Sequence, residues 1–278
     1  MDVLTRTSDW FAARGVPSPR LQAERILSHV LELPRLQLYL AHDRPLTEPE
    51  RDRLRTLVAR RGEREPLAWV LGEEGFHNID LHITADVLVP RPDTETLVNA
   101  TLEWVPESSE PLYLADIGCG SGAIGLALAT ARPNLRVYAV DCEPGPIHCT
   151  KQNVQTLQLA DRVAVLQGDL LEAVPAARPV DWVVSNPPYI PSQDIDDLEP
   201  EVSRWEPRSA LDGGADGLDV YRRLVPQAAQ RVRAGVLVEV GIHQHEAVAD
   251  LFRASGLIEV RTWTDLGGVV RVVGGRKA

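Results

Sequence analysis

The chain has 278 residues, of which 44% are hydrophobic and 25% charged, and its net charge is −11. This composition is typical of globular proteins, and the length fits one large domain or two smaller ones. No run of apolar residues approaches the roughly 18 that a membrane helix needs, and the N-terminus lacks the pattern of a signal peptide. The acidic charge argues against a nucleic-acid substrate, because proteins that grip nucleic acid usually carry a basic face.

Cysteine and histidine show no pattern of a metal site. Cys119, Cys142 and Cys149 are too few and too irregularly spaced for a disulfide framework or a zinc site. His243 and His245 lie on a predicted strand-to-helix turn without cysteine or paired carboxylates, so they are not expected to bind a metal. We therefore expect a cytoplasmic protein with no metal and no membrane association.

Residues 1–74 are predicted to form a small helical domain. One helix is expected to begin at Ser18-Pro19, where a capping hydroxyl precedes proline at the first helical position. The capping-box pattern of Thr47 and Glu50 predicts a second helix that runs to about Arg61. Arginine is frequent here, at positions 51, 53, 55, 60, 61 and 64. These arginines fit either a solvated helix face or a docking surface for an acidic or RNA-bound partner.

Residues 75–92 are predicted to form a β-hairpin linker, because Ile79, Leu81 and Ile83 alternate with polar residues. A helix is expected from Asp93 to Val105. The rest of the chain alternates short apolar runs with helical segments, which predicts a largely parallel sheet covered on both faces. The last two runs, 257–263 and 269–273, have no helix between them. They predict an antiparallel edge, and so a seven-stranded, Rossmann-like α/β domain over residues 93–278.

The segment from Asp116 to Gly122 follows the first strand of this sheet and opens a helix. Its glycines allow a sharp turn and let a ligand lie against the backbone. A carboxylate just before the glycines would repel the pyrophosphate of a dinucleotide, but it suits a cationic ligand with an amino group and a sulfonium. Asp141 and Asp169 follow the next two strands, where carboxylates can accept hydrogen bonds from ribose hydroxyls and an adenine amino group. A glycine-rich turn alone is a weak signal, but three successive carboxylates strengthen it.

The tetrapeptide Asn186-Pro187-Pro188-Tyr189 follows a later strand. Its prolines fix the backbone and remove two amide donors, so the loop presents oxygen acceptors. If the Asn186 side-chain oxygen and the Pro187 carbonyl each accept one N–H of a planar NH₂ group, they hold its nitrogen and favour the positive charge that develops during methyl transfer. The Tyr189 ring can pack on the planar group. The loop predicts methyl transfer to nitrogen and leaves amide and adenine acceptors open.

These motifs together resemble the HemK/PrmC methyltransferases, which methylate glutamine N5 in the Gly-Gly-Gln motif of peptide-chain release factors. The resemblance covers almost the whole chain. Val87–Glu95 looks like the linker signature of the family, and the segments 206–207, 211–214 and 216–218 match the stretch that follows its substrate loop. It implies the seven-stranded methyltransferase domain, a small N-terminal α-helical domain that docks release factors, and a cytoplasmic role in translation termination.

The resemblance also implies a set of site residues. The expected catalytic residues are Asn186, Pro187 and Tyr189, and glutamine is expected to be bound by Asn186, Pro187, Pro188 and Tyr189. The cofactor is S-adenosyl-L-methionine, with S-adenosyl-L-homocysteine as product, and its expected binding residues are Asp116, Gly118, Cys119, Gly120, Ser121, Gly122, Asp141, Asp169, Leu170 and Asn186. A monomer is expected.

Other acceptors and one non-catalytic function were weighed against this prediction. Adenine N6 methyltransferases use a similar loop, because adenine also presents a planar NH₂, and glutamine methyltransferases of ribosomal proteins share it. The acidic charge and the lack of an obvious target-recognition domain argue against DNA. The helical N-terminal part favours a release factor over a ribosomal protein. A binding or scaffold protein of the same fold is disfavoured by the intact carboxylates and loop.

Overall fold

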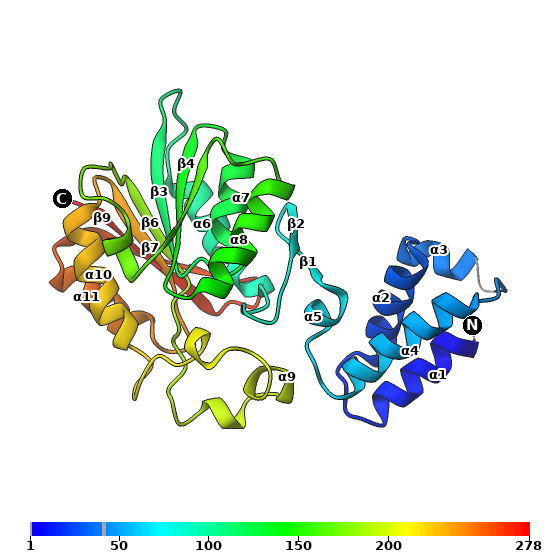
Figure 1. The fold of residues 1–278 in the computed structure, drawn as a ribbon. Coiled ribbons are helices and arrows are strands. Elements are labelled where there is room, and N and C mark those ends of the chain that lie inside the picture. Colours follow the sequence, from blue (N-terminus) through cyan, green and yellow to red (C-terminus); the bar gives the residue numbers. More distant parts are fainter. Residues whose placement is uncertain (1, 41–42) are drawn as a thin grey trace. The chain divides into compact units, whose positions relative to one another are not determined.

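The computed structural model describes residues 2–40 and 43–278, which form two compact units (Figure 1). The first unit comprises Met1–Glu73 together with a later segment, Glu199–Trp205. The second comprises Glu74–Leu198 and Glu206–Ala278. A segment distant in sequence therefore completes the first unit, which the sequence analysis did not anticipate.

The first unit is a helical bundle with its own apolar core. Phe11 and Ile26 are fully buried in it. A Cβ atom on Gly62 would lie only 2.1 Å from the ring of Trp10, so glycine permits the close approach of two helices at this point. The helices are α1 (Asp2–Ala12), α2 (Pro19–Leu31), α3 (Arg35–Leu40), α4 (Glu48–Gly62), α5 (Leu67–Leu71) and α9 (Pro200–Ser203).

Both predicted helix starts are confirmed, but one is capped differently than expected. The Thr47 amide donates a hydrogen bond of 2.8 Å to Glu50 Oε2, as a capping box requires. The Ser18 side chain, in contrast, makes no cap hydrogen bond. Its φ of 45° is left-handed, whereas a capping side chain normally projects from extended backbone.

The arginines of α4 and the turn after it are largely engaged in ion pairs. Arg51 pairs with Glu48 at 2.6 Å on the surface. The Arg61 side chain is only 1% exposed and donates to Glu201 at 2.6 Å. Arg64 donates to the same carboxylate. Two of the six arginines thus stabilise the interior of the first unit rather than forming a solvated basic face.

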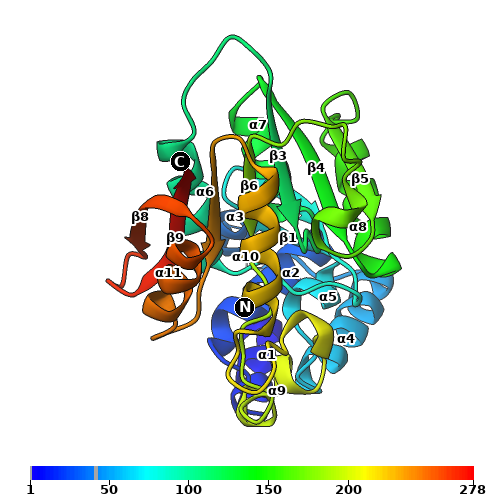
Figure 2. The ribbon, with the colours of Figure 1, turned by 90° about the vertical axis from the view of Figure 1, so that its left-hand side faces the viewer.

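The second unit is built on a seven-stranded sheet with the order β5-β4-β3-β6-β7-β9-β8, and Figure 2 shows the strands side by side. The pairs from β5 to β7 are parallel, whereas β9 is antiparallel to both of its neighbours. The predicted fold class and antiparallel edge are confirmed. The strands are β3 (Leu112–Ile117), β4 (Leu135–Asp141), β5 (Val163–Gln167), β6 (Trp182–Ser185), β7 (Gly235–Glu239), β8 (Leu257–Thr264) and β9 (Val270–Lys277).

Helices cover both faces of this sheet (Figure 1). One face carries α6 (Glu95–Trp104), α7 (Ala123–Ala131) and α8 (Pro144–Thr156), and the other carries α10 (Asp219–Arg231) and α11 (His245–Ala254). The core on the second face includes Val183, Val236, Tyr221 and Phe252, all fully buried. Short 3₁₀ helices occur at η1 (Pro92–Thr94), η2 (Leu170–Ala173), η3 (Ile195–Asp197) and η4 (Arg208–Ala210). Among the described residues, no helix is both long and apolar enough to span a bilayer.

A two-stranded hairpin, β1 (Glu73–Phe76) and β2 (Ile79–His82), lies at the start of the segment 75–92 in which a hairpin linker is predicted, whereas residues 83–91 form no strand. Ile79 and Leu81 are buried and alternate with exposed residues, as the sequence pattern predicts. The Asn153 side chain makes two hydrogen bonds to the backbone of His82. The His82 N–H donates to Asn153 Oδ1 at 2.8 Å, and the His82 carbonyl accepts from Asn153 Nδ2 at 2.9 Å. Asn153 lies in α8, so these bonds fix β2 against that helix within the second unit.

Candidate active site

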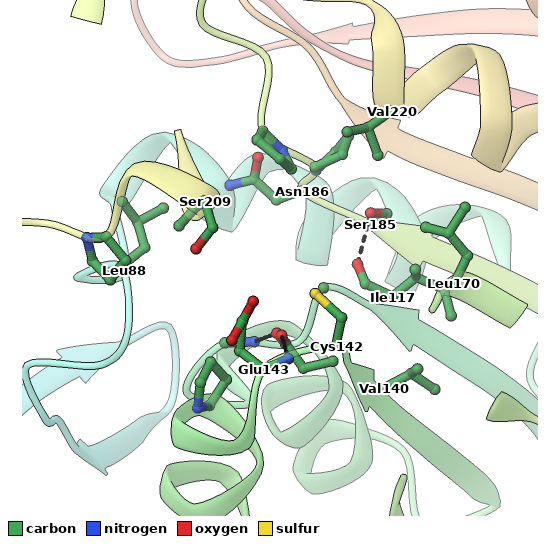
Figure 3. Close-up of a pocket in the computed structure, with 18 of the residues that line it drawn as sticks. Leu88, Ile117, Val140, Cys142, Glu143, Leu170, Ser185, Asn186, Ser209 and Val220 are labelled. Carbon is green, nitrogen blue, oxygen red and sulfur yellow. Dashed lines mark hydrogen bonds between the residues drawn. The ribbon is translucent and has the colours of Figure 1, made fainter. Parts of the chain in front are cut away.

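The candidate site lies where the strand order of the sheet reverses. Strand β3 pairs with β4 on one side and β6 on the other, and Ile117 is in register with Ser185 at their carboxyl ends. The loops after both strands therefore start side by side, at the position where open parallel sheets bind ligands. A cavity of about 270 Å³ lies there (Figure 3). The predicted site residues that line it are Gly118, Gly120, Asp141, Asp169, Leu170, Asn186, Pro187 and Pro188.

The three glycines of the loop after β3 have different environments. All three have positive φ, at 72°, 57° and 85° for Gly118, Gly120 and Gly122. A Cβ atom on Gly118 or Gly120 would meet nothing within 4 Å. On Gly122 it would lie 2.8 Å from Leu126 and 3.1 Å from Thr150. The first two glycines thus form an open cradle on the cavity, whereas Gly122 allows close packing and does not line the cavity.

Asp141 is held rigidly at the end of β4. Its Oδ2 accepts from the Gly120 amide at 3.0 Å and its Oδ1 from the Glu143 amide at 3.1 Å. Burial raises the pKa of Asp141, and these hydrogen bonds oppose the shift. Because each carboxylate oxygen has a second lone pair, the group can also accept hydrogen bonds from vicinal hydroxyls in the cavity.

Asp116 does not lie at the cavity surface, although the sequence predicts that it binds the ligand there. It is fully buried beneath the glycine loop and does not line the cavity. Its Oδ2 accepts from the Gly125 amide at 2.8 Å, so it supports the start of α7, while its Oδ1 has no hydrogen-bond partner among the described residues. Burial raises its pKa to about 7. Cys119 and Ser121 are likewise buried and outside the cavity lining, since their side chains pack under the loop.

Asp169 lines the cavity but is not a free acceptor. It forms an ion pair with Arg223, which also lines the cavity. The next residue, Leu170, has a left-handed backbone with φ of 48° and supplies apolar lining. A planar base in this region would therefore meet an apolar surface edged by a paired carboxylate.

Asn186 faces the cavity (Figure 3). The two prolines after it also line the cavity. The Asn186 Nδ2 group donates a hydrogen bond of 3.2 Å to Thr94 Oγ1. The Asn186 side-chain oxygen is thereby left as the end of the amide that is available to a ligand. Pro187 and Pro188 have no amide N–H, so this part of the lining offers few hydrogen-bond donors.

Tyr189 is placed differently from the expected ring-stacking position. Its ring packs against the apolar core and is absent from the cavity lining. Its carbonyl accepts from Gln244 Nε2 at 2.9 Å, and Gln244 Oε1 accepts from the Gly241 amide at 3.0 Å. Burial, together with the charge of Glu239, raises the pKa of Tyr189 to about 12. In this structure the tyrosine anchors the end of the loop.

Several lining residues escaped the sequence analysis. Cys142 and Glu143 directly follow Asp141, and Leu88 belongs to the linker signature (Figure 3). Ser209 comes from the segment after the substrate loop. Their positions next to recognised motifs are the sequence feature from which a role in the cavity could have been predicted. The buried acid Glu239 behind the loop had no signal of this kind, since it ends an otherwise apolar strand.

Comparison with known proteins agrees with this architecture. Residues 2–72 match the PrmC N-terminal domain family, and residues 99–199 match the methyltransferase small domain family. The release factor glutamine methyltransferase of Geobacter sulfurreducens is 43% identical over 276 residues, covering 99% of this chain and 95% of the relative. That of Rhodospirillum rubrum is 46% identical, covering 95% and 80%. The crystal structure of the hMettl16 catalytic domain in complex with MAT2A 3'UTR hairpin 6 shares the fold at 16% identity, with a TM-score of 0.59 and 82% coverage of each chain.

The sheet order and the cavity at its switch point define a methyltransferase of the Rossmann-like class. Within that class, the identity to full-length relatives is decisive. The chain belongs to the release factor glutamine methyltransferase family.

Proposed function

We propose that the enzyme methylates the side-chain N5 of the glutamine in the Gly-Gly-Gln motif of peptide-chain release factors, with S-adenosylmethionine as methyl donor. The observation that carries the proposal is that one cavity is lined both by the glycine cradle with Asp141 and by the Asn186–Pro188 acceptors. Methyl donor and methyl acceptor can therefore meet in a single cavity. The relatives at 43% and 46% identity are named for this substrate.

The cavity residues fit S-adenosylmethionine, which when bound supplies a methyl group on a sulfonium sulfur and leaves as S-adenosylhomocysteine. Gly118 and Gly120 leave room for a ligand directly against the backbone. Asp141 would accept from the ribose hydroxyls, and Leu170 would pack on the adenine, with Asp169 at its edge. Asp116 would act through the field of its carboxylate and by holding α7, because it is buried outside the cavity.

The Asn186 loop meets the chemical problem of an amide acceptor. An amide nitrogen is a weak nucleophile because its lone pair is delocalised. Two acceptors, Asn186 Oδ1 and the Pro187 carbonyl, would orient its N–H bonds and stabilise the positive charge that develops on nitrogen. Pro188 would form part of the wall of the glutamine pocket. The methylated nitrogen then loses a proton readily, so no strong base is required.

The proposal places the enzyme in the cytoplasm, as a monomer acting in translation termination, with the helical unit docking the release factor. Ribosomal-protein glutamine and nucleic-acid adenine remain the alternative acceptors. The ion pairs of Arg51, Arg61 and Arg64 weaken the case for a nucleic acid, because they neutralise charge that a phosphate backbone would need.

The substrate assignment is tested by incubating the purified protein with methyl-labelled S-adenosylmethionine and a purified release factor. Label should appear on the glutamine of the Gly-Gly-Gln peptide. A parallel reaction with ribosomal protein and with DNA provides the comparison. Label in either of these and none in the release factor would overturn the assignment while leaving methyl transfer intact.

The proposed role of Asn186 is tested with Asn186→Ala. We expect methyl transfer to fall at least about 100-fold, because one of two acceptors for the reacting group is lost, while cofactor binding stays measurable by calorimetry. Asn134→Ala is a matched control, since Asn134 precedes β4 at the opposite edge of the sheet. Wild-type turnover in Asn186→Ala would refute the role.

A further inference from the structure

Glu239 is a buried acid that the proposed function does not use. It is the last residue of β7 and only 2% exposed. Its Oε2 has no hydrogen-bond partner within residues 2–40 and 43–278, and its main-chain carbonyl accepts from the Tyr221 hydroxyl at 2.6 Å. A buried carboxylate with an open lone pair is costly, so its position calls for an explanation.

Glu239 lies directly behind the substrate loop. Ser185 is in register with Val238 on the neighbouring parallel strand, so Asn186 and Glu239 follow side by side. Thr94 connects them. It is 4% exposed and its Oγ1 accepts from Asn186 Nδ2 at 3.2 Å. Hydrogen bonding from the Thr94 side chain also lowers the pKa of Glu239, which places its hydroxyl toward that carboxylate.

The direction of these hydrogen bonds decides which end of the Asn186 amide faces the cavity. A threonine hydroxyl has one proton and can donate only once. An ionised carboxylate accepts only, so Glu239 takes that proton and leaves a lone pair of Thr94 toward Asn186. Only the NH₂ end of the amide can bond to a lone pair. The oxygen end is then directed to the ligand.

We propose that Thr94 and Glu239 are positioning residues that lock the Asn186 side chain with its oxygen toward the methyl-accepting NH₂ group. The inference rests on the proposed function for the identity of that group. Without the lock the amide would be free to flip and to present its own NH₂ to the substrate NH₂. Donor would then face donor, and the acceptor would no longer be held.

The lock is sensitive to protonation of Glu239. Burial raises its pKa to about 7, while the Thr94 hydroxyl, the Arg271 charge and the Tyr189 hydroxyl oppose the rise and Asp93 adds to it. Tyr221 on α10 stays neutral, because burial raises its pKa well above the ordinary value. Below a pH of about 7 a protonated Glu239 can donate to Thr94, which frees the threonine proton to bond to the asparagine oxygen. The oriented state is therefore expected above that pH and lost below it.

Kinetics of Thr94 variants on a Gly-Gly-Gln peptide test the lock. Thr94→Val should lower kcat about 10- to 100-fold with KM for S-adenosylmethionine within about threefold, the range expected when a buried hydrogen bond is broken. Thr94→Ser keeps the hydroxyl and should restore kcat to within about threefold. Thr101→Val is the matched control, because Thr101 is also buried, lies on α6, and donates its hydroxyl to the Leu97 carbonyl within its own helix, at 2.7 Å.

Glu239→Gln tests the titration. The fall in wild-type kcat as pH drops through about 7 should disappear in this variant, because its side chain no longer ionises there. An unchanged acid limb in Glu239→Gln would overturn the role of the carboxylate. Equal kcat losses in Thr94→Val, Thr94→Ser and Thr101→Val would reduce Thr94 to a structural residue.

A measurement without substrate separates this inference from the proposed function. In ¹⁵N-labelled full-length protein, the side-chain NH₂ of Asn186 is assigned by its absence from Asn186→Asp. It should show a nuclear Overhauser effect to the Thr94 methyl group and exchange slowly in the wild type and Thr94→Ser, but exchange faster in Thr94→Val. Fast exchange in the wild type would refute the lock, even if glutamine is methylated. Slow exchange in a protein that does not methylate glutamine would refute only the substrate.

Discussion

Two acids, Asp116 and Glu239, are buried beneath the two loops that form the cavity. In the part of the chain that the structure describes, each has one carboxylate oxygen without a hydrogen-bond partner. Burial raises the pKa of each to about 7. Near neutral pH the folded protein therefore holds protons that the unfolded chain has released. Burying these two carboxyl groups beneath the cavity loops therefore lowers the stability of the folded protein.

The pH dependence of stability gives a residue-scale prediction for Asp116. Its pKa rises from 3.8 unfolded to about 7 folded, so the folded state binds the extra proton between these values. Stability must fall as pH rises through that window and then level off. Asp116→Asn cannot ionise and should lack this decline. The thermal midpoint of the variant relative to wild type should thus be higher at pH 8 than at pH 4.

Thermal unfolding of both proteins in matched buffers from pH 4 to 8 measures the difference. A constant difference in midpoint across this range would show that Asp116 does not titrate as described. The wild-type curve alone is insufficient, because Glu239 shifts in the same direction.

The sequence predicted some site residues and missed others for a physical reason. Asp141 and Asn186 follow strands within recognisable motifs, and they line the cavity. Asp116 lies within a strand that is buried on both faces, so no polar alternation indicates where its side chain points. Thr94 and Glu239 come together only through strand register and the packing of a 3₁₀ turn, which local sequence does not encode.

At the scale of elements, the loop after β3 combines two uses of glycine in five residues. Gly118 and Gly120 border open space, whereas Gly122 packs against Leu126 and Thr150. Regular spacing made the three look equivalent in the sequence. Their difference depends on the α7 and α8 side chains around them.

A pair of alanine substitutions separates these uses. Gly118→Ala and Gly122→Ala both put a side chain on left-handed backbone and share a strain of about 1–2 kcal/mol. Only Gly122→Ala adds a steric clash, worth about 1–3 kcal/mol of further destabilisation. Urea unfolding should rank Gly122→Ala as the less stable protein. Calorimetry should show the larger loss of S-adenosylmethionine affinity in Gly118→Ala, and the opposite ranking in both experiments would contradict the assignment.

The periodic elements were predictable to within a few residues. Alternating apolar runs and helical segments located the strands from β3 to β9, because a buried strand forms a short continuous apolar run whereas a helix is a longer segment. The cap of α2 was predicted wrongly, since the propensity of serine gives no information about the left-handed backbone at Ser18. The apolar residues of the loop 190–218 follow no regular period. The sequence therefore did not indicate that part of this loop belongs to the first unit.

At the scale of the whole molecule, the first unit depends on a residue far along the chain. Glu201 lies in Glu199–Trp205 and binds Arg61 and Arg64, of which Arg61 is 1% exposed. Burial lowers the pKa of Arg61 and the Glu201 charge opposes that shift. The Glu201 carboxylate thus compensates a buried charge whose other hydrogen-bond acceptors, the Gln22 side chain and the Glu65 carbonyl, are neutral.

Removing this carboxylate should destabilise the first unit strongly. For Glu201→Ala we expect a loss of about 3–5 kcal/mol, because it leaves an uncompensated buried charge. Asp52→Ala is the matched control, since Asp52 and Arg55 are an exposed pair with 70% and 72% of their side chains accessible, and it should cost under about 1 kcal/mol. Differential scanning calorimetry of the full-length variants measures both, and equal midpoints would refute the role of Glu201.

The interrupted make-up of the first unit also bears on how it can be exchanged between relatives. The polypeptide passes from one unit to the other three times, after residues 73, 198 and 205. A chimera joined only at residue 73 would take Arg61 and Arg64 from one parent protein and Glu201 from the other. Its folding would depend on whether these residues of the two parents form the same ion pairs. Chimeras of two relatives should therefore fold when residues 199–205 and the N-terminal helices come from the same parent. We expect these two segments to be exchanged together.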